Sequence, residues 1–480
     1  MTTAASTPPG PRPPATLSHL AWLLLAVLLA AHLLIVAAPG FFSHDEWNRC
    51  DEVSRYGLAK YLHMYFRVCA GPSFAHPVRP IGFLDEGLNS LFMRRLPVVP
   101  HLFDVTLHAA NAILLLLALH AAGMKRQVAW LAALLFALSP LTPMTTGWTA
   151  ASFDLWYTLF VLASAWVAIL IWQQGASLPK LLLLTLFSAA AICSKETAMV
   201  LPLALALTAL TCAWAGKERI NWQRLAAIVA TSAVPVASYL LIRLPALRRS
   251  FSGPQKTTYY TPSLSAVPGN LLHYLAYPFF VNVDQVFKIQ HHAPQITLAL
   301  LLIQILLAAA LMQRLGVRFG LLYLGGYLLF LLPVLTLQGS YSHYLYASAI
   351  PMSVALAALL TSAWQKRHWL TMSGLTAITF CLTAHFASNE LAIYQTARCQ
   401  SRFLDSLDTR MAVESTKGTR LLFIQPEPGA PADVGIQAII ERPGYGGGNP
   451  TPEVTFDPSR FRTSDPSEVR VTMNSQCEVR

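Results

Sequence analysis

The sequence predicts a mostly α-helical bundle that crosses a membrane about eleven times and carries a small β-rich domain at its C-terminus. Of the 480 residues, 54% are hydrophobic and only 12% are charged. Many apolar runs approach twenty residues, the length that an α-helix needs to cross the hydrocarbon core of a bilayer. These features exclude a soluble globular domain. No nucleic-acid motif is visible, so we expect no nucleic-acid partner.

The apolar runs define the predicted membrane domain, residues 18–388. Residues 1–17 are a Pro-rich leader that we expect to be disordered. The first span, 18–38, ends in small residues that would suit signal cleavage, but its length and weakly charged start favour an uncleaved anchor. The other predicted spans are 101–120, 127–146, 154–172, 180–194, 197–215, 224–243, 295–313, 318–337, 344–363 and 368–388.

Short basic loops predict the orientation of these spans. Loops containing Lys125, Lys217, Arg314 and Lys366 should all be cytoplasmic. They share one side only if 266–283 does not cross, and its Tyr, His and Pro residues favour an interfacial or re-entrant helix. The N-terminus is then cytoplasmic, and the first loop (39–100) and the domain 389–480 are periplasmic, in a bacterial inner membrane. The seven Lys/Arg of the first loop oppose this orientation, but long loops weigh little in the rule.

Charge is distributed unevenly along the chain. Residues 1–389 hold 24 Lys/Arg and 11 Asp/Glu, whereas residues 390–480 hold 10 and 12. The basic body favours anionic membrane lipid or a phosphorylated lipid substrate as partner. Of its eleven carboxylates, only Glu218 falls on the predicted cytoplasmic side. A surface that serves only solubility would not need this bias, so the sequence predicts a polar site at the outer face.

The seven cysteines predict two disulfides. Cys50 and Cys69 lie in the first loop, and Cys399 and Cys477 bracket the tail, all outside apolar runs. Within the tail, short runs rich in β-formers alternate with turn residues. We interpret the tail as an acceptor-binding or structural cap. The runs predicted as strands are Leu421–Ile424, Ile436–Ile440, Val454–Phe456 and Val469–Met473.

Several short motifs follow one another along the chain. They are Phe42-Ser43-His44-Asp45-Glu46, Arg79-Pro80, Pro100-His101-Leu102, Phe136 to Pro140 with Trp148 and Asp154, Ser194-Lys195-Glu196-Thr197, Asn282-Val283-Asp284 and His343-Tyr344-Leu345-Tyr346. In kind and order they resemble motifs of the GT-C superfamily of membrane glycosyltransferases, and most of all those of its protein O-mannosyltransferase-like, TMTC-type branch. The chain departs from the branch at Ser139 and Met144, where His and Glu are usual, and at His343, where Arg is usual. No tetratricopeptide repeat follows, so mannose is not implied.

The resemblance implies an enzyme that moves a sugar, with inversion, from a polyprenyl phosphate to a protein or glycolipid acceptor on the periplasmic face. Such transfer needs a base for the acceptor hydroxyl, stabilisation of the phosphate leaving group, and alignment of both. We predict Asp45 as the base, at a bilayer edge where desolvation raises a carboxylate pKa, and Glu46 as the less favoured neighbour. The predicted substrate-binding residues are Arg79, His101, Asp154, Lys195, Glu196, Arg248, Arg249, Asp284, His343 and Tyr344.

Plainer roles remain open for several of these residues. Lys195-Glu196 also fits a buried ion pair that locks two helices. Arg248-Arg249 also fits a headgroup-facing loop, and His343-Tyr344 an interfacial anchor. His101 lacks the partner ligands of a zinc site. A divalent cation, Mg²⁺ or Mn²⁺, would fit the three aspartates Asp45, Asp154 and Asp284, but no feature requires a metal.

Two other functions remain as alternatives. An O-antigen ligase or polymerase would use a diphosphate donor and place its key basic residues in a late periplasmic loop, whereas the marked motif here is in the first loop. A lipid-linked sugar transporter or flippase would place ionisable residues near the membrane midplane and show internal repeats, and neither is apparent in the sequence.

Overall fold

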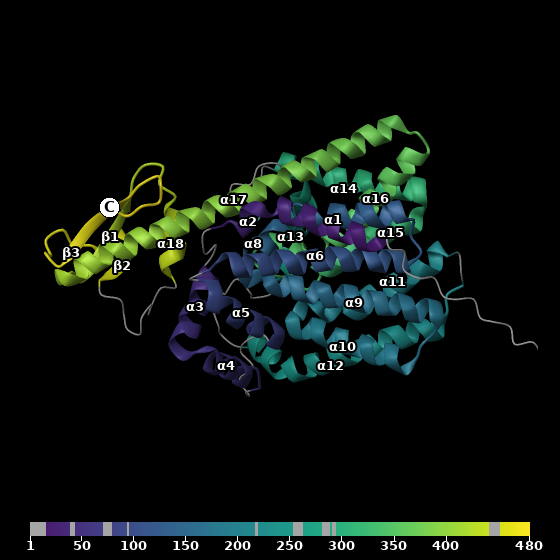
Figure 1. Cartoon of the computed structure of the whole chain (residues 1–480), viewed down its shortest axis with the longest axis horizontal. Helices are drawn as coiled ribbons and strands as arrows, with labels where there is room; N and C mark the ends of the chain where they lie inside the picture. Colours follow the sequence, from purple (N-terminus) through teal and green to yellow (C-terminus); the bar gives the residue numbers. More distant parts are fainter. Residues whose placement is uncertain are drawn as a thin grey trace, which may run out of the picture.

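The architecture was obtained as a computed structural model, which describes residues 16–38, 44–70, 79–93, 96–216, 219–252, 263–280, 289, 294–440 and 452–480. The side chains of Asp45, Arg248 and Arg249 lie outside the described part, as does all of Asp284. Figure 1 shows a bundle of helices with a short sheet at one end, joined by the long helix α17. The predicted fold class is therefore confirmed.

The helices follow the apolar runs closely. In chain order they are α1 (Thr16–Ala31), α2 (Leu33–Val36), α3 (His44–Tyr56), α4 (Leu58–Ala70), α5 (Pro80–Met93), α6 (Val98–Ala121), α7 (Arg126–Ala137), α8 (Pro143–Gly147), η1 (Thr149–Ala151), α9 (Ser152–Gln174), α10 (Leu178–Ser194), η2 (Glu196–Val200), α11 (Leu201–Ala215), α12 (Trp222–Ser252), η3 (Leu264–Ala266), α13 (Val267–Ala276), η4 (Tyr277–Phe279), α14 (Pro294–Leu315), α15 (Val317–Leu331), η5 (Ser342–Leu345), α16 (Ala349–Gln365), α17 (Trp369–Thr416), α18 (Ala432–Ile440) and η6 (Pro458–Arg460).

Among the described residues, six helices are long and apolar enough to cross a membrane, and five shorter apolar helices accompany them. Each of the eleven predicted spans coincides with one of these helices, and the chain is a multi-pass membrane protein. Helix α13 has ten residues, about 15 Å, or half the thickness of a hydrocarbon core. Its length agrees with the prediction that 266–283 does not cross.

Two helices end well before their predicted spans do, α15 at Leu331 and α7 at Ala137. We predicted a helix over 127–146, but α7 ends at Ala137 and a turn leads into the five-residue α8. Pro140 and Pro143 fall inside the predicted span. Proline lacks the amide donor that a helix interior needs and disfavours helical backbone in the residue before it, so the helix ends ahead of them.

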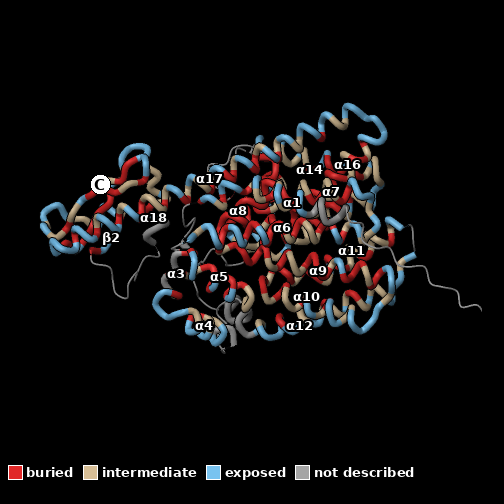
Figure 2. The backbone as a smooth tube through the Cα atoms, in the orientation of Figure 1, coloured by how far each residue is buried: buried red, intermediate tan, exposed pale blue. Residues whose placement is uncertain are grey.

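The core of the bundle is aromatic as well as aliphatic. Phe136, Tyr274, Tyr327 and Tyr346 are among the largest side chains that are less than 2% exposed. Figure 2 shows buried residues concentrated where α6, α8 and α9 run through the middle of the bundle, with exposed residues along its edges. The part of the interior around these helices is therefore largely shielded from the surface.

The C-terminal unit is a three-stranded parallel sheet in the order β2-β1-β3, formed by β1 (Leu421–Pro426), β2 (Glu453–Thr455) and β3 (Glu468–Met473). Three of the four predicted strands are confirmed. The prediction for Ile436–Ile440 is wrong, because this run belongs to α18. Pro431 stands immediately before that helix and Asp433 lies in its first turn, where a carboxylate stabilises the helix dipole.

Helix α17 ties this unit to the bundle. It has 48 residues and runs without a break through position 389. Phe403 and Leu407 on α17 pack against Leu422 and Val471 of the sheet. The predicted disulfide between Cys399 and Cys477 is confirmed. The predicted Cys50–Cys69 bond stays a prediction, because the side chain of Cys69 lies outside the described residues.

Candidate active site

The polar groups of the predicted site meet along one short segment, residues 148–154. Its backbone is extended at Trp148, passes through the single turn η1, and enters α9 at Ser152. In the first turn of α9, Asp154 is a carboxylate at the positive end of the helix dipole. Side chains from α3, α5 and η5, and that of Lys195 between α10 and η2, contact residues of this segment.

Asp154 forms a buried ion pair with Lys195. The Lys195 Nζ atom lies 2.6 Å from both carboxylate oxygens, and each side chain is less than 5% exposed. Lys195 sits between α10 and η2 in an extended conformation that interrupts the helix. A buried charge without its partner costs several kcal/mol, so each residue fixes the other.

Glu196 takes a different partner, Arg79, which directly precedes α5. The Arg79 Nε atom lies 2.6 Å from Glu196 Oε2, and Nη2 bonds Oε1, so the contact is bidentate. The guanidinium also lies over the Phe153 ring, 5.1 Å from its centroid. Burial alone would lower the pKa of Arg79, but the Glu196 carboxylate raises it above its ordinary value. The first loop and η2 are thus joined by a permanently charged pair.

Aromatic side chains cover these ion pairs. The Tyr344 ring centroid is 4.6 Å from Lys195 Nζ, and the His343 ring lies 4.2 Å from that of Tyr344. Trp148 meets His343 edge to face at 5.2 Å. Burial, and then the charges of Lys195 and Arg79, lower the pKa of His343 well below its ordinary value. His343 is therefore a neutral imidazole at physiological pH.

Carboxylates of the first loop contact the same segment. Glu46 Oε1 accepts hydrogen bonds from the Thr149 amide at 2.7 Å and the Thr149 hydroxyl at 2.8 Å. Asp85 accepts a hydrogen bond from the Ser152 hydroxyl. Burial raises the pKa of Asp85 to about 6, although the bond from Ser152 opposes the shift. Asp85 thus titrates close to physiological pH.

Asp104 completes an acidic group with Glu46 and Asp85. It is fully buried on α6, and neither of its carboxylate oxygens has a hydrogen-bond partner among the described residues. Asp85 and Glu46 lie close enough for their charges to repel it. His101 is also fully buried, three residues earlier on the same face of α6. Within the described part of the chain, no three His, Cys, Asp or Glu side chains are spaced to hold a metal.

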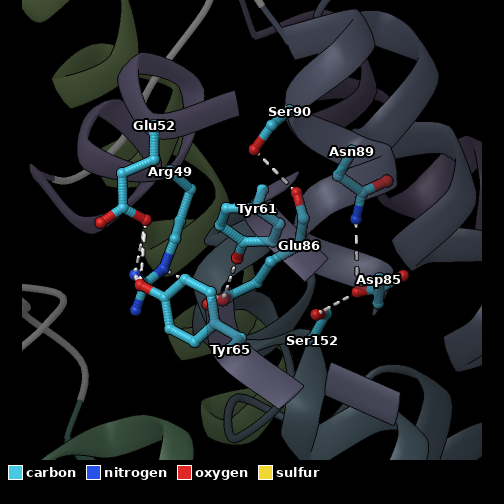
Figure 3. A network of polar contacts seen from close by, with 9 residues as sticks. All are labelled: Arg49, Glu52, Tyr61, Tyr65, Asp85, Glu86, Asn89, Ser90 and Ser152. Carbon is cyan, nitrogen blue, oxygen red and sulfur yellow. Dashed lines mark hydrogen bonds and ion pairs between the residues drawn. The ribbon is translucent and has the colours of Figure 1, made fainter. Parts of the chain in front are cut away.

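A second polar network braces the three helices of the first loop (Figure 3). Arg49 of α3 forms ion pairs with Glu52 at 3.2 Å and with Glu86 of α5 at 3.1 Å. Tyr65 of α4 donates to Glu52, and Tyr61 donates to Glu86. These bonds hold α5, and with it Asp85, at a fixed position beside Ser152.

The structure therefore brings together Arg79, Asp154, Lys195, Glu196, His343 and Tyr344 out of the predicted binding residues. Glu46 joins them through Thr149, and the backbone of Asp45 is part of α3. Arg248 and Arg249 belong to α12, and nothing is described of their side chains. Asp284 lies outside the described residues, so the predicted Asp45–Asp154–Asp284 cation site stays a prediction.

Sequence reasoning missed the roles of Arg49, Thr149 and Ser152. Arg49 lies within the acidic stretch from Asp45 to Glu52, where a lone cation among four carboxylates is a signal for ion pairing. Thr149 and Ser152 carry no comparable signal, because a hydroxyl residue near a helix start is common in any sequence.

The arrangement brings together groups that can accept a proton, groups that can bind a phosphate, and aromatic groups that can contact a sugar. Carboxylates that can hold or accept a proton contact residues 148–154, and so do the cations Lys195 and Arg79. Lys195 has three N–H donors and gives two to Asp154, whereas Arg79 has five and gives two to Glu196. The remaining donors suit a phosphate, and the aromatic side chains beside them suit the apolar face of a sugar.

No family model matches the sequence, and no curated protein matches it. Fifteen solved chains resemble it remotely, and three of them illustrate the range. The arabinofuranosyltransferase AftD from mycobacteria aligns with a TM-score of 0.44 and 16% identity over 88% of this chain and 31% of AftD. The oligosaccharyltransferase of Archaeoglobus fulgidus aligns with a TM-score of 0.43 and 10% identity over 84% of this chain and 62% of the oligosaccharyltransferase. ArnT from Cupriavidus metallidurans, bound to undecaprenyl phosphate, aligns with a TM-score of 0.43 and 14% identity over 85% of this chain and 83% of ArnT.

The chain thus spans less than a third of the length of AftD and less than two thirds of the oligosaccharyltransferase. At these TM-scores and identities, similarity assigns neither a family nor an activity to this chain.

Proposed function

We propose that this chain is a membrane glycosyltransferase of the GT-C type, which moves a sugar from a polyprenyl-phosphate donor to a hydroxyl of a protein or glycolipid acceptor. The observation that carries the proposal is the convergence on residues 148–154, where Glu46 and Asp85 meet the pairs Asp154–Lys195 and Arg79–Glu196. Proton-accepting and phosphate-binding groups belong to one connected set.

Asp45 is our proposed base. Its neighbour Glu46 holds two hydrogen bonds from Thr149, which stabilise the charged carboxylate and make it a weaker base. Asp85 is the second candidate, because its pKa of about 6 lies in the range that suits proton transfer at neutral pH. Either carboxylate would accept the proton of the acceptor hydroxyl as the hydroxyl attacks the sugar.

Lys195 and Arg79 would bind the phosphate that leaves. Both are held in place before substrate binds, so little reorganisation is needed when charge develops on the leaving group. Tyr344 and His343 lie beside Lys195 and would position the sugar. Undecaprenyl phosphate, the ligand of ArnT, is the kind of lipid phosphate that the proposed donor would leave after its sugar is transferred, but we rest the proposal on the contacts of this chain alone.

The proposal includes an orientation in a bacterial inner membrane. The acidic site and residues 389–480 would face the periplasm, and the leader and the basic loops would face the cytoplasm. Helix α18 of the C-terminal unit packs against α3, which carries the acidic stretch. A position next to the first loop is what an acceptor-binding cap requires.

Purified protein in proteoliposomes distinguishes the proposal from its alternatives. The donors are radiolabelled polyprenyl-monophosphate and polyprenyl-diphosphate sugars, each tested with and without acceptor glycans or peptides. We expect acceptor-dependent transfer from a monophosphate donor. Transfer from diphosphate donors only would favour the ligase or polymerase. Movement of the donor between leaflets without any transfer would favour the transporter or flippase.

A further inference from the structure

A large apolar cavity lies among α6, α9, α11, α14, α15 and α16. Its volume is about 620 Å³, within the range of pockets that enclose a ligand. Along α16 its lining extends from Ile350 to Lys366, which is about 24 Å of helix. Buried residues such as Leu162, Leu205 and Ala355 form its inner part. The cavity is therefore long and lined mainly by apolar side chains, which suits a hydrocarbon chain.

One end of the cavity is basic, and we call this end the mouth. Lys125, Arg314 and Lys366 line it where α6, α14 and α16 end, and no Asp or Glu is among the described residues of the lining. The Lys125 ammonium donates to Gln365 at 3.0 Å, and Arg314 donates to the Thr371 hydroxyl at 2.6 Å. Both cations are thus positioned by neutral partners, and neither forms an ion pair with a carboxylate among the residues that the structure describes.

The mouth lies at the opposite end of the bundle from the candidate active site. Helix α9 begins at the active site with Asp154, and its lining contact nearest the mouth is Ile169, four turns further along. The cations of the active site are already paired with carboxylates, whereas Lys125, Arg314 and Lys366 have no such pair within the described part of the chain. An amphiphile with an anionic head and an apolar tail fits this cavity with its head at the basic end.

We propose that the cavity binds an anionic phospholipid of the bilayer, with one acyl chain inside and its phosphate at Lys125, Arg314 and Lys366. Basic pockets between transmembrane helices recognise acidic headgroups in this way. The donor's own polyprenyl tail is a weaker fit, because its phosphate would have to lie at the opposite end, by Lys195. The site is independent of the transfer reaction proposed above.

The test is competition between phosphatidylglycerol and phosphatidylcholine for the purified full-length protein, measured by native mass spectrometry. Each cation near a headgroup contributes about 1 kcal/mol, so Lys125→Gln with Lys366→Gln should reduce the preference for phosphatidylglycerol roughly 30-fold. The matched control removes two charges that do not line the cavity, Arg126→Gln with Lys180→Gln, and should leave the preference unchanged. Ala358→Phe narrows the cavity and should weaken binding of both lipids.

Three outcomes would overturn the proposal. The first is that the parent protein binds both phospholipids equally. The second is that the control variant loses as much preference for phosphatidylglycerol as the variant with Lys125→Gln and Lys366→Gln. The third is that a polyprenyl phosphate displaces the phospholipid, and that this displacement is abolished by Ala358→Phe but unaffected by Lys125→Gln with Lys366→Gln. The last result would assign the cavity to the donor's tail. Thermal unfolding of each variant in detergent separates loss of binding from loss of folding.

Discussion

The ammonium of Lys195 bridges both carboxylate oxygens of Asp154 at 2.6 Å, across 41 residues of sequence and in a site with almost no solvent contact. Adjacent Glu196 turns to Arg79 instead. The motif Ser194-Lys195-Glu196-Thr197 therefore contacts two different parts of the chain. Lys195 binds the start of α9, and Glu196 binds the first loop. This double connection makes the candidate site one unit.

Removing one partner of the buried pair should destabilise the protein strongly. Lys195→Met leaves the Asp154 carboxylate uncompensated, which costs about 3–5 kcal/mol. The double variant Lys195→Met with Asp154→Leu removes both charges and should recover much of that loss. Denaturant unfolding in detergent, followed by tryptophan fluorescence, measures both. A double variant no more stable than Lys195→Met would show that the pair is not the source of the effect.

Gly82 should tolerate no side chain. A methyl group there would overlap Cδ1 and Cε1 of Phe153, whose ring supports the Arg79 guanidinium. Overpacking of this kind costs about 1–3 kcal/mol, so Gly82→Ala should lower stability and weaken substrate binding together. Gly374→Ala is the matched control, because open space surrounds that position in α17. Similar melting temperatures for the two variants would contradict the close contact.

Asp85 should make stability depend on pH. Its pKa rises from 3.8 to about 6 on folding, so between these values the native state binds more protons than the unfolded state. The free energy of unfolding therefore falls as pH rises from about 4 to 6, by at most about 3 kcal/mol from this group. Asp85→Asn should flatten that part of the profile. An unchanged slope in the variant would place the titrating group elsewhere.

The Cys399–Cys477 disulfide should stabilise the C-terminal unit and not the bundle. It closes a loop over 78 positions, for which loss of chain entropy predicts about 4 kcal/mol. Replacing both cysteines with Ser should make residues 420–480 sensitive to protease, while residues 96–380 stay resistant. Cys381→Ser, in the apolar part of α17, is the control. Equal protease resistance of parent and double variant would contradict this.

The arrangement of spans could be predicted from the sequence, because a long apolar run has few ways to fold in a bilayer. Because carboxylates are rare in the membrane domain, Asp154 and Glu196 could likewise be predicted as site residues from the sequence. Partner choice could not be predicted. Lys195 pairs with Asp154 and not with the adjacent Glu196 because of how α9 and α10 pack, which no local pattern encodes.

Shorter elements were harder to predict for a different reason. Ile436–Ile440 is a five-residue apolar run that suits a strand or a buried helix equally by periodicity. Only the helix-start residues before it, Pro431 and Asp433, distinguish the two. The bonds of Thr149 to Glu46 and of Ser152 to Asp85 are likewise consequences of tertiary packing. The sequence predicted Glu46 as a site residue, but its partner and that of Asp85 emerged only from the structure.

The most direct test of the account is the rate of sugar transfer from a radiolabelled polyprenyl-phosphate donor in membranes, compared between the parent and Asp45→Asn. We expect loss of at least about 100-fold, since a positioned base contributes 10²–10⁴ in rate. Glu46→Gln is the control and should lose less, because that carboxylate is engaged by Thr149. Full activity in a correctly folded Asp45→Asn would contradict Asp45 as the base and leave Asp85 in its place. No transfer by the parent from any monophosphate donor would contradict the proposed function itself.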